Sequence, residues 1–459
     1  MKDTIHAIVQ DIHTKKVVVM GAGESGVGAA ILAQKKGAQV WVSDYGKIKE
    51  KYQKVLDIYS IPYEEGKHTK EKFFDADCIV KSPGIPQKVP FVKELKKRGK
   101  LIVSEIEFAS WFTDAFILAI TGSNGKTTTT SLLFHILKAN GVNAAIGGNI
   151  GNSFAYLVAN KAYDYYVLEI SSFQLEDTFL FRPNVAILTN ITPDHLDRYE
   201  YQLENYAKTK FAIGKNQEEE DVFIYCSDDL VTLGMLDNQN IQANRLAFGL
   251  KETKNSNIWF DESKGLIKSN HPKLNISTKE LQVKGRHNLY NAMAAIGAAK
   301  CLSLTNAAIE SALGGFAPIP HRLEPVKTVN GVIYINDSKA TNVEAVWYAL
   351  DSIQTSIVWI VGGVDKGNDY TSLLELVKKK VRVLITLGKY KEKLIANFAS
   401  LVDEIEEAMS MEEAVDKAYK RAHSGECVLL SPACASFDLF QNYEHRGNEF
   451  KRFVGGFDA

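Results

Sequence analysis

The chain has few cysteines, and they show no pattern that would suggest pairing. Among its 459 residues there are five cysteines, which is an odd number. They are scattered, and no Cys-x-x-Cys spacing occurs. Free thiols of this kind suit a reducing cytoplasm. The five are Cys78, Cys226, Cys301, Cys427 and Cys434.

Long apolar runs and an excess of charge of one sign are also missing. Residues 1–16 are polar and lack the apolar core of a signal peptide, and no run is long enough to span a bilayer. The formal net charge is −1, so no global field draws the chain to nucleic acid or to a membrane. We therefore expect a cytoplasmic protein with no nucleic-acid partner and no membrane insertion.

What is present is a long chain in which strand-like and helix-like patterns alternate. A chain of 459 residues exceeds what one core usually organises, so we expect about three domains. The alternation predicts an α/β fold with a Rossmann-like N-terminal domain, a P-loop-type central ATPase domain and a Rossmann-like C-terminal domain. A Pro-rich hinge at 318–320 would end the central domain. The expected domains are residues 1–104, 105–318 and 319–459.

The segment 121–128 has the layout of a nucleoside-triphosphate loop. An apolar run at 116–120 leads into it, and apolar residues recur behind it at helical spacing. In such a loop, backbone N–H groups and a helix N-terminus face the phosphates, a lysine neutralises them and a hydroxyl reaches Mg²⁺. Ile120 or Thr121 stands where the common pattern has its first glycine, so the loop is a shorter variant. The candidate phosphate-binding residues are Gly122, Ser123, Asn124, Gly125, Lys126, Thr127 and Thr128.

A second glycine-rich turn lies near the N-terminus. An apolar strand at 16–20 leads into the turn at 21–28, and a second strand ends in the acid Asp44. This order is the βαβ fingerprint of nucleotide binding. The fingerprint does not separate a nicotinamide dinucleotide from a UDP-sugar, so a nicotinamide-dependent oxidoreductase is an open alternative at this point.

Polar residues follow several of the predicted strands, where parallel sheets bind ligands. Glu169 ends one strand, and a carboxylate there can hold Mg²⁺ opposite the Thr127 hydroxyl. His195 lies in a loop with three charged groups after another strand, which favours a ligand or metal role. Three more loops follow strands of the last region and are expected to converge on one crevice: 336–342, 362–367 and 431–438.

Two further positions are candidates for nucleotide contacts. Asn288 and Asn291 are three residues apart on a predicted helix, so they share a face, and their amides could read an adenine edge. Arg322 follows the hinge, where a guanidinium suits a phosphate that arrives on domain closure.

Taken together in this order and spacing, these motifs resemble the Mur ligase family. The resemblance covers nearly the whole chain and includes the short triphosphate loop. It implies an ATP-dependent amide ligation that passes through an acyl phosphate, in peptidoglycan precursor synthesis. The loops at 337–342, 365–367 and 431–438 resemble the branch that adds D-glutamate to UDP-N-acetylmuramoyl-L-alanine. The resemblance also implies that ATP and Mg²⁺ are required, and we expect a monomer.

The resemblance assigns roles to single residues in the first two domains. Lys126, Glu169, His195 and Lys210 would be catalytic, with Lys210 carbamylated so that it carries a negative charge. Thr127, Glu169, His195 and Lys210 would hold Mg²⁺. The UDP-substrate site would comprise Gly21, Gly23, Gly26, Asp44, Tyr45, Gly84 and Asn149.

The remaining roles fall mostly in the last domain. Asn288 and Asn291 would read the adenine, Asp337 the ribose, and Arg322 and Lys339 the phosphates of ATP. The D-glutamate pocket would comprise Thr341, Lys366, Ser436, Phe437 and Tyr443.

Three alternatives differ in what they explain. An oxidoreductase has no use for a separate triphosphate loop, and a P-loop switch would leave the third domain without a role. Within the family, other members add L-alanine, a diamino acid, a dipeptide or folate glutamates. The Asp-Asn-Pro-Arg pattern expected of the diamino-acid ligases is absent.

Overall fold

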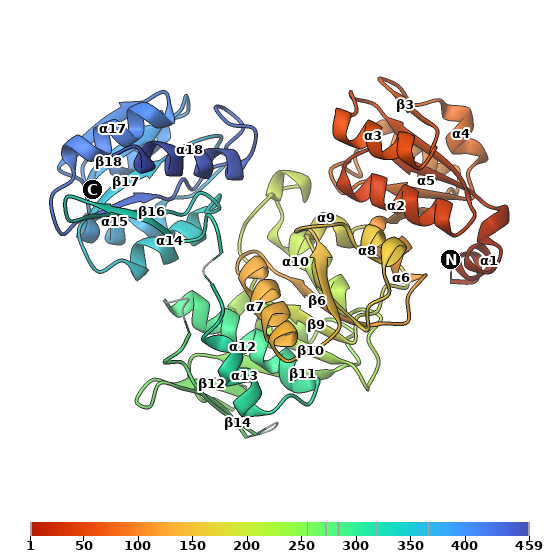
Figure 1. Ribbon diagram of the computed structural model, residues 1–459, viewed down its shortest axis with the longest axis horizontal. Helices are drawn as coiled ribbons and strands as arrows, with labels where there is room; N and C mark the ends of the chain where they lie inside the picture. The colour runs from red at the N-terminus through yellow and green to blue at the C-terminus, as the bar shows by residue number, and fades with distance from the viewer. Residues whose placement is uncertain are drawn as a thin grey trace. The chain divides into compact units, whose positions relative to one another are not determined.

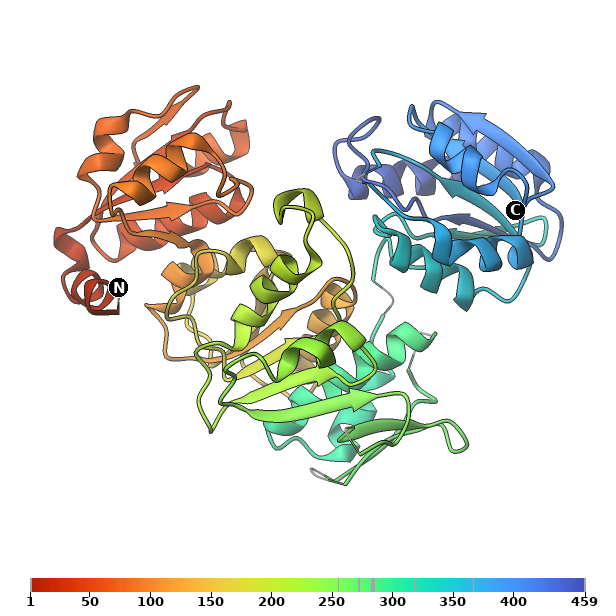
Figure 2. The same cartoon turned by 180° about the vertical axis from the view of Figure 1, so that it is seen from behind.

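The computed structural model describes residues 2–254, 256–270, 273–281, 285–317, 319–365 and 367–457. The chain divides into two compact units, of which the first comprises Met1–Glu280 and Tyr290–Gly314 and the second Leu281–Leu289 and Gly315–Ala459. The described residues form three sheets, which can be followed in Figure 1 and, from behind, in Figure 2.

The first sheet has the strand order β3-β2-β1-β4-β5, and all its pairs are parallel. Alternate residues of β1 point to opposite faces, so Val17 and Val19 join one apolar cluster and Val18 and Met20 the other. Burial on both faces is typical of a parallel sheet covered by helices. The elements are α1 (Lys2–Gln10), β1 (Lys16–Met20), α2 (Glu24–Lys35), β2 (Gln39–Asp44), α3 (Glu50–Ile58), β3 (Tyr63–Glu65), α4 (Lys70–Asp75), β4 (Cys78–Lys81), α5 (Pro90–Lys97) and β5 (Ile102–Ser104).

The second sheet has the order β14-β13-β12-β11-β10-β9-β6-β8-β7. Its pairs are parallel from β7 to β12, and β13 and β14 add an antiparallel edge. The strands are β6 (Phe116–Thr121), β7 (Ala144–Gly148), β8 (Tyr165–Glu169), β9 (Val185–Leu188), β10 (Val222–Cys226), β11 (Asn244–Gly249), β12 (Ile258–Asp261), β13 (Leu266–Ser269) and β14 (Leu274–Ser277). The helices are α6 (Glu105–Ser110), α7 (Lys126–Ala139), α8 (Phe154–Asn160), α9 (Ser172–Leu175), α10 (Leu203–Phe211), α11 (Leu230–Leu236), α12 (Arg286–Cys301) and α13 (Asn306–Leu313).

The third sheet has the order β15-β16-β20-β17-β18-β19, with one antiparallel pair, β15 with β16, at its edge. Its two faces are buried in separate apolar clusters. The strands are β15 (Glu324–Val329), β16 (Val332–Asn336), β17 (Ile357–Val361), β18 (Val381–Leu387), β19 (Glu404–Ala408) and β20 (Cys427–Leu430). The helices are α14 (Val343–Ser352), α15 (Leu374–Lys380), α16 (Glu392–Phe398), α17 (Met411–Arg421) and α18 (Tyr443–Gly455).

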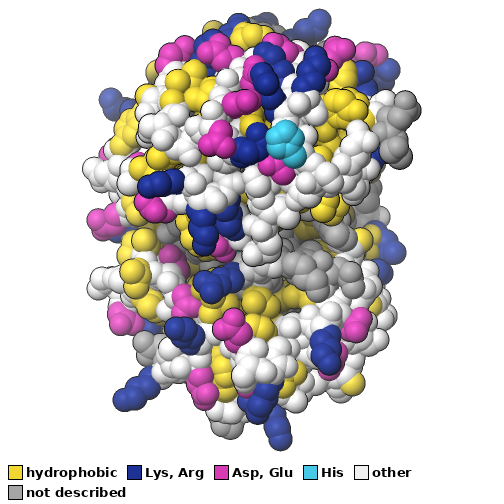
Figure 3. All heavy atoms as spheres, turned by 90° about the vertical axis from the view of Figure 1, so that its left-hand side faces the viewer, with side chains coloured by type: hydrophobic (Ala, Val, Ile, Leu, Met, Phe, Trp, Pro, Cys, Tyr) yellow, Lys and Arg dark blue, Asp and Glu magenta, His cyan; other side chains and the backbone are white. Residues whose placement is uncertain are grey.

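These sheets confirm the predicted three-domain α/β fold class. The strands β11 to β14 lie between residues 244 and 277. Within the described ranges, no helix is both long and apolar enough to cross a membrane. On the face drawn in Figure 3, basic and acidic side chains are interspersed.

The first and second sheets pack together through α2 and α8. Gly28 of α2 allows this contact, because a Cβ there would lie 2.0 Å from Ser153 Oγ. The apolar residues of both domains accordingly form one continuous cluster, which runs from α1 and α2 into the second sheet. The first unit therefore has a core that extends across the predicted boundary near residue 104.

Glu107 of α6 anchors the chain that follows α9. Its carboxylate is buried and accepts hydrogen bonds from the backbone N–H groups of Phe179, Leu180 and Phe181 at 2.8–3.1 Å. The indole N–H of Trp111 donates to the same carboxylate at 2.9 Å. An ionised carboxylate accepts all these bonds at once, which a neutral amide cannot do.

We expect Glu107→Gln to lower the free energy of unfolding of the first unit by about 1–3 kcal/mol, because an amide N–H₂ would face buried donors. The midpoint of thermal unfolding, followed by circular dichroism, checks this. Glu71→Gln, at an exposed position of α4, is the control. Equal midpoints for the two variants would contradict the anchoring role.

Candidate functional site

A cavity of about 740 Å³ lies at the carboxyl edge of the first sheet. Five of the residues predicted for the UDP-substrate site line it: Gly21, Gly23, Asp44, Tyr45 and Gly84. The cavity is therefore where the βαβ fingerprint predicts a nucleotide.

The turn after β1 is shaped by close approaches. Gly21 has a φ of +97°, and a Cβ on it would lie 2.7 Å from Ser82 Oγ. The carboxylate of Asp44 accepts a hydrogen bond from Ala22 N at 2.7 Å, which fixes the turn to the end of β2. Gly26 is not among the lining residues; a Cβ there would lie 1.9 Å from the carbonyl oxygen of Gly21, so this glycine lets α2 approach the turn.

Two aromatic residues that the sequence analysis missed also line the cavity. The rings of His68 and Phe91 stack with centroids 5.6 Å apart, and the exposed Tyr45 lies 5.8 Å from His68. Burial lowers the pKa of His68, although Glu64 and Asp44 act in the opposite direction. Aromatic side chains in a cavity suit a planar base. Neither His68 nor Phe91 belongs to a recognisable motif, so the sequence carries no signal for them.

The segment 121–128 forms the predicted strand–loop–helix. β6 ends at Thr121, and Gly125, with a φ of 82°, precedes the first residue of α7, Lys126. The Nζ of Lys126 donates to the carbonyls of Gly122 and Ser123, both at 2.8 Å. A Cβ on Gly122 would lie 1.9 Å from Thr189 Oγ1.

The chain after β9 holds this loop in place. Asn124 N donates to Asn190 Oδ1 at 2.9 Å, and the Thr189 hydroxyl donates to the carbonyl of Asn124 at 2.6 Å. Ser123 Oγ donates to the carbonyl of Thr192 at 2.9 Å. The side chains of Thr127 and Thr128 are buried at the start of α7.

Lys210 of α10 is buried beneath the same loop. This residue is 1% exposed, and its Nζ donates to the carbonyl of Gly122 at 2.7 Å. Burial, and then the positive charge of Lys126, hold the pKa of Lys210 well below its usual range, while Asp194 and Glu169 act in the opposite direction. Lys126 and Glu169 are thus close enough to Lys210 for their charges to act on it.

Glu169 ends β8 and is buried, and its Oε1 accepts a hydrogen bond from Asn149 Nδ2 at 2.7 Å. Asn149 therefore lies at the edge of the second sheet, away from the lining of the cavity in the first. His195 has a φ of 53°, and its Nε2 lies 3.7 Å from Asp194 Oδ1. In the part of the chain that the structure describes, no group of three or more His, Cys, Asp or Glu side chains could hold a metal ion.

The three polar loops of the last domain follow β16, β17 and β20, which are neighbours in the third sheet. Arg446 of α18, which is 1% exposed, bonds to all three loops. Its guanidinium donates to Ser338 Oγ at 3.0 Å, to Ser338 O at 2.8 Å, to Gly362 O at 3.4 Å and to Cys434 O at 3.1 Å. Burial lowers the pKa of Arg446 to about 10. The sequence analysis gave Arg446 no role.

Asp337 lies in the first of these three loops. Its carboxylate accepts hydrogen bonds from Ser431 Oγ at 2.8 Å and Leu323 N at 3.2 Å, and burial raises its pKa to about 7. The Nζ of Lys339 lies 5.1 Å from the ring centroid of Tyr443.

The other predicted residues occupy varied environments. Asn291 is buried, accepts a hydrogen bond from Thr129 Oγ1 at 3.3 Å and lies against Gly125. Asn288 and Ser436 are buried, and Phe437 is 72% exposed. Arg322 and Thr341 are half-buried. Lys366 lies outside the described residues.

Comparison with known proteins places this geometry in a family. Residues 120–299 match the model of the Mur ligase middle domain, and residues 321–434 match that of the Mur ligase glutamate ligase domain. Residues 16–90 match the MurD N-terminal domain.

Curated relatives match nearly end to end. UDP-N-acetylmuramoylalanine–D-glutamate ligase of Christiangramia forsetii is 50% identical over 96% of this chain and 99% of its own length. The ligase of the same name from Porphyromonas gingivalis is 51% identical over 95% of this chain and 98% of its own.

Solved structures share the fold. The UDP-N-acetylmuramate–alanine ligase MurC of Thermotoga maritima matches with a TM-score of 0.61 at 19% identity, covering 96% of this chain and 99% of that one. The MurF ligase of Thermotoga maritima in complex with ADP also gives a TM-score of 0.61, at 16% identity, covering 97% of this chain and 99% of that one.

These matches decide against the oxidoreductase and the P-loop switch, and they confirm the resemblance seen in the sequence. The chain belongs to the Mur ligase family.

Proposed function

We propose that this chain is an ATP-dependent ligase that joins D-glutamate to UDP-N-acetylmuramoyl-L-alanine in peptidoglycan precursor synthesis. One observation carries the proposal: a nucleotide-sized cavity and a triphosphate loop occur in one compact unit of the chain. The high identity to ligases named for D-glutamate supports the choice of amino acid.

The chemistry must overcome the poor electrophilicity of a carboxylate. A carboxylate oxygen of the L-alanyl group attacks the γ-phosphorus of ATP, and ADP leaves with the electron pair of the broken P–O bond. The amine of D-glutamate then attacks the acyl carbon, inorganic phosphate leaves, and the amine loses a proton. Holding the reactants together can remove about 7–11 kcal/mol of the barrier in favourable cases.

Lys126 is the main fixed cation for this reaction. It begins α7 beside the loop carbonyls of Gly122 and Ser123, so its charge lies where the triphosphate would bind. There it offsets the repulsion between the triphosphate and the attacking carboxylate. The helix N-terminus adds backbone N–H groups to the same face.

Mg²⁺ would be held by Thr127, Glu169, His195 and carbamylated Lys210, and it would neutralise charge on the triphosphate. Hydroxyl, carboxylate and carbamate oxygens with one imidazole fit this cation. Asn149, which donates to Glu169 Oε1, would orient that carboxylate.

Carbamylation of Lys210 has a physical basis in its burial. A lysine amine reacts with CO₂ only when neutral, and the pKa of Lys210 is held well below its usual range. Burial therefore favours the neutral amine more than it is favoured in an exposed lysine. The carbamate would add a negative charge beside Lys126.

The proposal also says where each of the three substrates would bind. The UDP moiety would bind in the cavity of the first sheet. Adenosine triphosphate would contact Asn288, Asn291, Arg322, Asp337 and Lys339. D-glutamate would be bound by Thr341, Lys366, Ser436, Phe437 and Tyr443.

We also propose that the domains span residues 1–104, 105–318 and 319–459, and that the chain acts as a monomer in the cytoplasm. The five cysteines are free thiols, which supports a reducing compartment.

The proposal predicts substrate preference. Purified chain is supplied with ATP, UDP-N-acetylmuramoyl-L-alanine and one amino acid at a time, and phosphate release is measured. We expect D-glutamate to support the highest rate, with little release when either acceptor is omitted. Equal rates with L-alanine, a diamino acid or L-glutamate would contradict the assignment.

Carbamylation predicts chemical rescue. Lys210→Ala is expected to lower kcat at least about 100-fold, because it removes a ligand at the site of charge development. Added short carboxylates such as formate should restore part of the rate. Lys208→Ala is the matched control on the same helix, where Lys208 forms an exposed pair with Glu204. A Lys210→Ala variant that no carboxylate rescues would refute the carbamate.

The bonds of Arg446 to three loops of the last domain predict that its substitution weakens the binding of D-glutamate alone. Arg446→Lys should raise the KM for D-glutamate about tenfold, since lysine lacks the planar fork that joins three loops. The KM for UDP-N-acetylmuramoyl-L-alanine should stay within about twofold, because the cavity lies in the other unit. Arg452→Lys, at an exposed position of the same helix, is the control. An unchanged KM for D-glutamate would remove this role from Arg446.

A further inference from the structure

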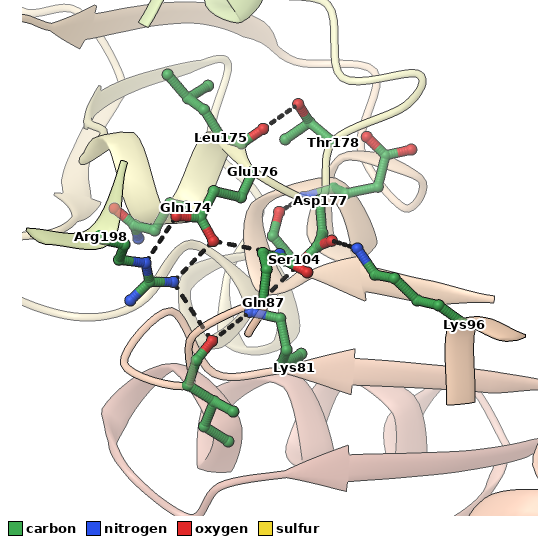
Figure 4. A network of polar contacts seen from close by, with 12 residues as sticks. Lys81, Gln87, Lys96, Ser104, Gln174, Leu175, Glu176, Asp177, Thr178 and Arg198 are labelled. Carbon is green, nitrogen blue, oxygen red and sulfur yellow. Dashed lines mark hydrogen bonds and ion pairs between the residues drawn. The ribbon is translucent and has the colours of Figure 1, made fainter. Parts of the chain in front are cut away.

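A buried polar cluster joins the first sheet to the second, and Figure 4 shows it. It connects the chain after β4, which lines the cavity, to the segments that follow β8 and β9. We call it the Asp177 cluster. Its members are Lys81, Gln87, Lys96, Glu176, Asp177 and Arg198.

The acidic members come from the second sheet and meet cations from both. Asp177 pairs with Lys81 at 3.2 Å and with Lys96 at 3.3 Å, and Glu176 pairs with Arg198 through two bonds of 2.7 Å. The side chains of Lys81 and Asp177 are 1% and 3% exposed. The pairing is thus largely removed from water, where charge-assisted bonds are strong and directional.

On the cavity side, the bonds converge on one peptide group. The carbonyl of Ile85 accepts from Lys81 Nζ at 2.8 Å and from Arg198 Nη2 at 3.3 Å. Gln87 Nε2 donates to Asp177 Oδ2 at 2.7 Å and to Glu176 Oε2 at 3.2 Å. Since Ile85 lines the cavity, one wall of the cavity is attached directly to the second sheet.

On the other side, Arg198 lies next to the predicted catalytic groups. Its backbone N–H donates to the carbonyl of His195 at 3.0 Å. Its guanidinium stacks 4.0 Å from the ring centroid of Phe173, and that ring contacts the His195 ring at 5.0 Å. Phe173 belongs to α9, which begins three residues after Glu169. One side chain therefore contacts the cavity wall and the surroundings of both catalytic residues.

We propose that Lys81 and Arg198 are positioning residues that set the reach from the nucleotide cavity to the triphosphate loop. This inference rests on the proposed function. A substrate anchored by its UDP end must place its far carboxylate beside the γ-phosphate. The Asp177 cluster holds the cavity wall and the His195 loop at one separation, so it selects a UDP-sugar whose acyl arm has the matching length.

Cohesion alone does not explain these charges. The two sheets already share an apolar core through α2 and α8. A buried ion pair often adds little net stability compared with apolar residues of the same size, because both charges lose their hydration. What directional bonds add is a defined geometry, and a displacement of about 1 Å at a reacting centre can cost 10²-fold in rate.

The test distinguishes binding of the UDP moiety in the cavity from placement of the far carboxylate at the triphosphate loop. Arg198→Lys and Lys81→Met are prepared in the full chain, together with Arg98→Lys, a control at an exposed pair on the first domain. For each we measure kcat and KM with UDP-N-acetylmuramoyl-L-alanine, the KM for ATP, the Kd for UDP alone and the thermal midpoint. UDP alone would occupy only the cavity, so its Kd reports binding in the cavity and not the placement of the carboxylate.

We expect kcat/KM for UDP-N-acetylmuramoyl-L-alanine to fall about 10- to 100-fold in both variants. The Kd for UDP and the KM for ATP should stay within about threefold, and Arg98→Lys should match the wild type. An unchanged kcat/KM would overturn the inference, and so would a Kd for UDP that rises by the same factor as kcat/KM falls. If Arg198→Lys does not fold, Lys81→Met alone decides. Wild-type chain that does not turn over D-glutamate would instead refute the proposed function.

Discussion

The alignment of three neighbouring strands, β9, β6 and β8, is the constraint on which the candidate site depends. They are parallel, and their register places Ile120 beside Glu169 and Thr121 beside Leu188. The predicted triphosphate loop, the carboxylate of Glu169 and the segment 189–192 therefore emerge at one edge. The glycines of the loop follow from this crowding, because Thr189 and Asn291 leave no room for a Cβ at Gly122 and Gly125.

The same edge forces two lysines to share one acceptor. Lys126 and Lys210 both donate to the carbonyl of Gly122, at 2.8 and 2.7 Å. Two full positive charges this close in a partly buried site would repel strongly. Lys210 is the buried one of the two, and burial together with the charge of Lys126 lowers its pKa. Glu169 and Asp194 act in the opposite direction, because their negative charges favour the protonated form of Lys210.

The sequence predicts what periodicity and glycine-rich turns encode. The strands β1, β2 and β6 lie where the sequence analysis expected them, because buried apolar runs and glycine turns are local signals. The short or edge strands β3, β5, β15 and β19 were not assigned, since their residues are few or partly polar.

The site was predictable to the extent that motifs carry it. Five of the seven residues expected at the UDP-substrate site line the cavity, whereas Gly26 supports the turn and Asn149 contacts Glu169. His68 and Phe91 come together only in the folded chain, because they follow different strands and form no sequence motif. The Asp177 cluster could not be predicted from the sequence for the same reason, since Lys81 and Arg198 are distant in sequence.

Buried polar groups explain how two domains in one unit keep a fixed geometry. Apolar contact between α2 and α8 holds the sheets together, but the hydrophobic effect is non-directional and permits small displacements. Asp177 removes that freedom, because its carboxylate bonds to Gln87 and Lys81 of the first domain. The backbone carbonyl of Asp177 also accepts a hydrogen bond from Ser104 N at 2.9 Å, at the predicted end of the first domain. A rigid junction is required if a long substrate is anchored in one domain and activated in the next. Any displacement of one domain relative to the other would displace the substrate carboxylate by a similar distance.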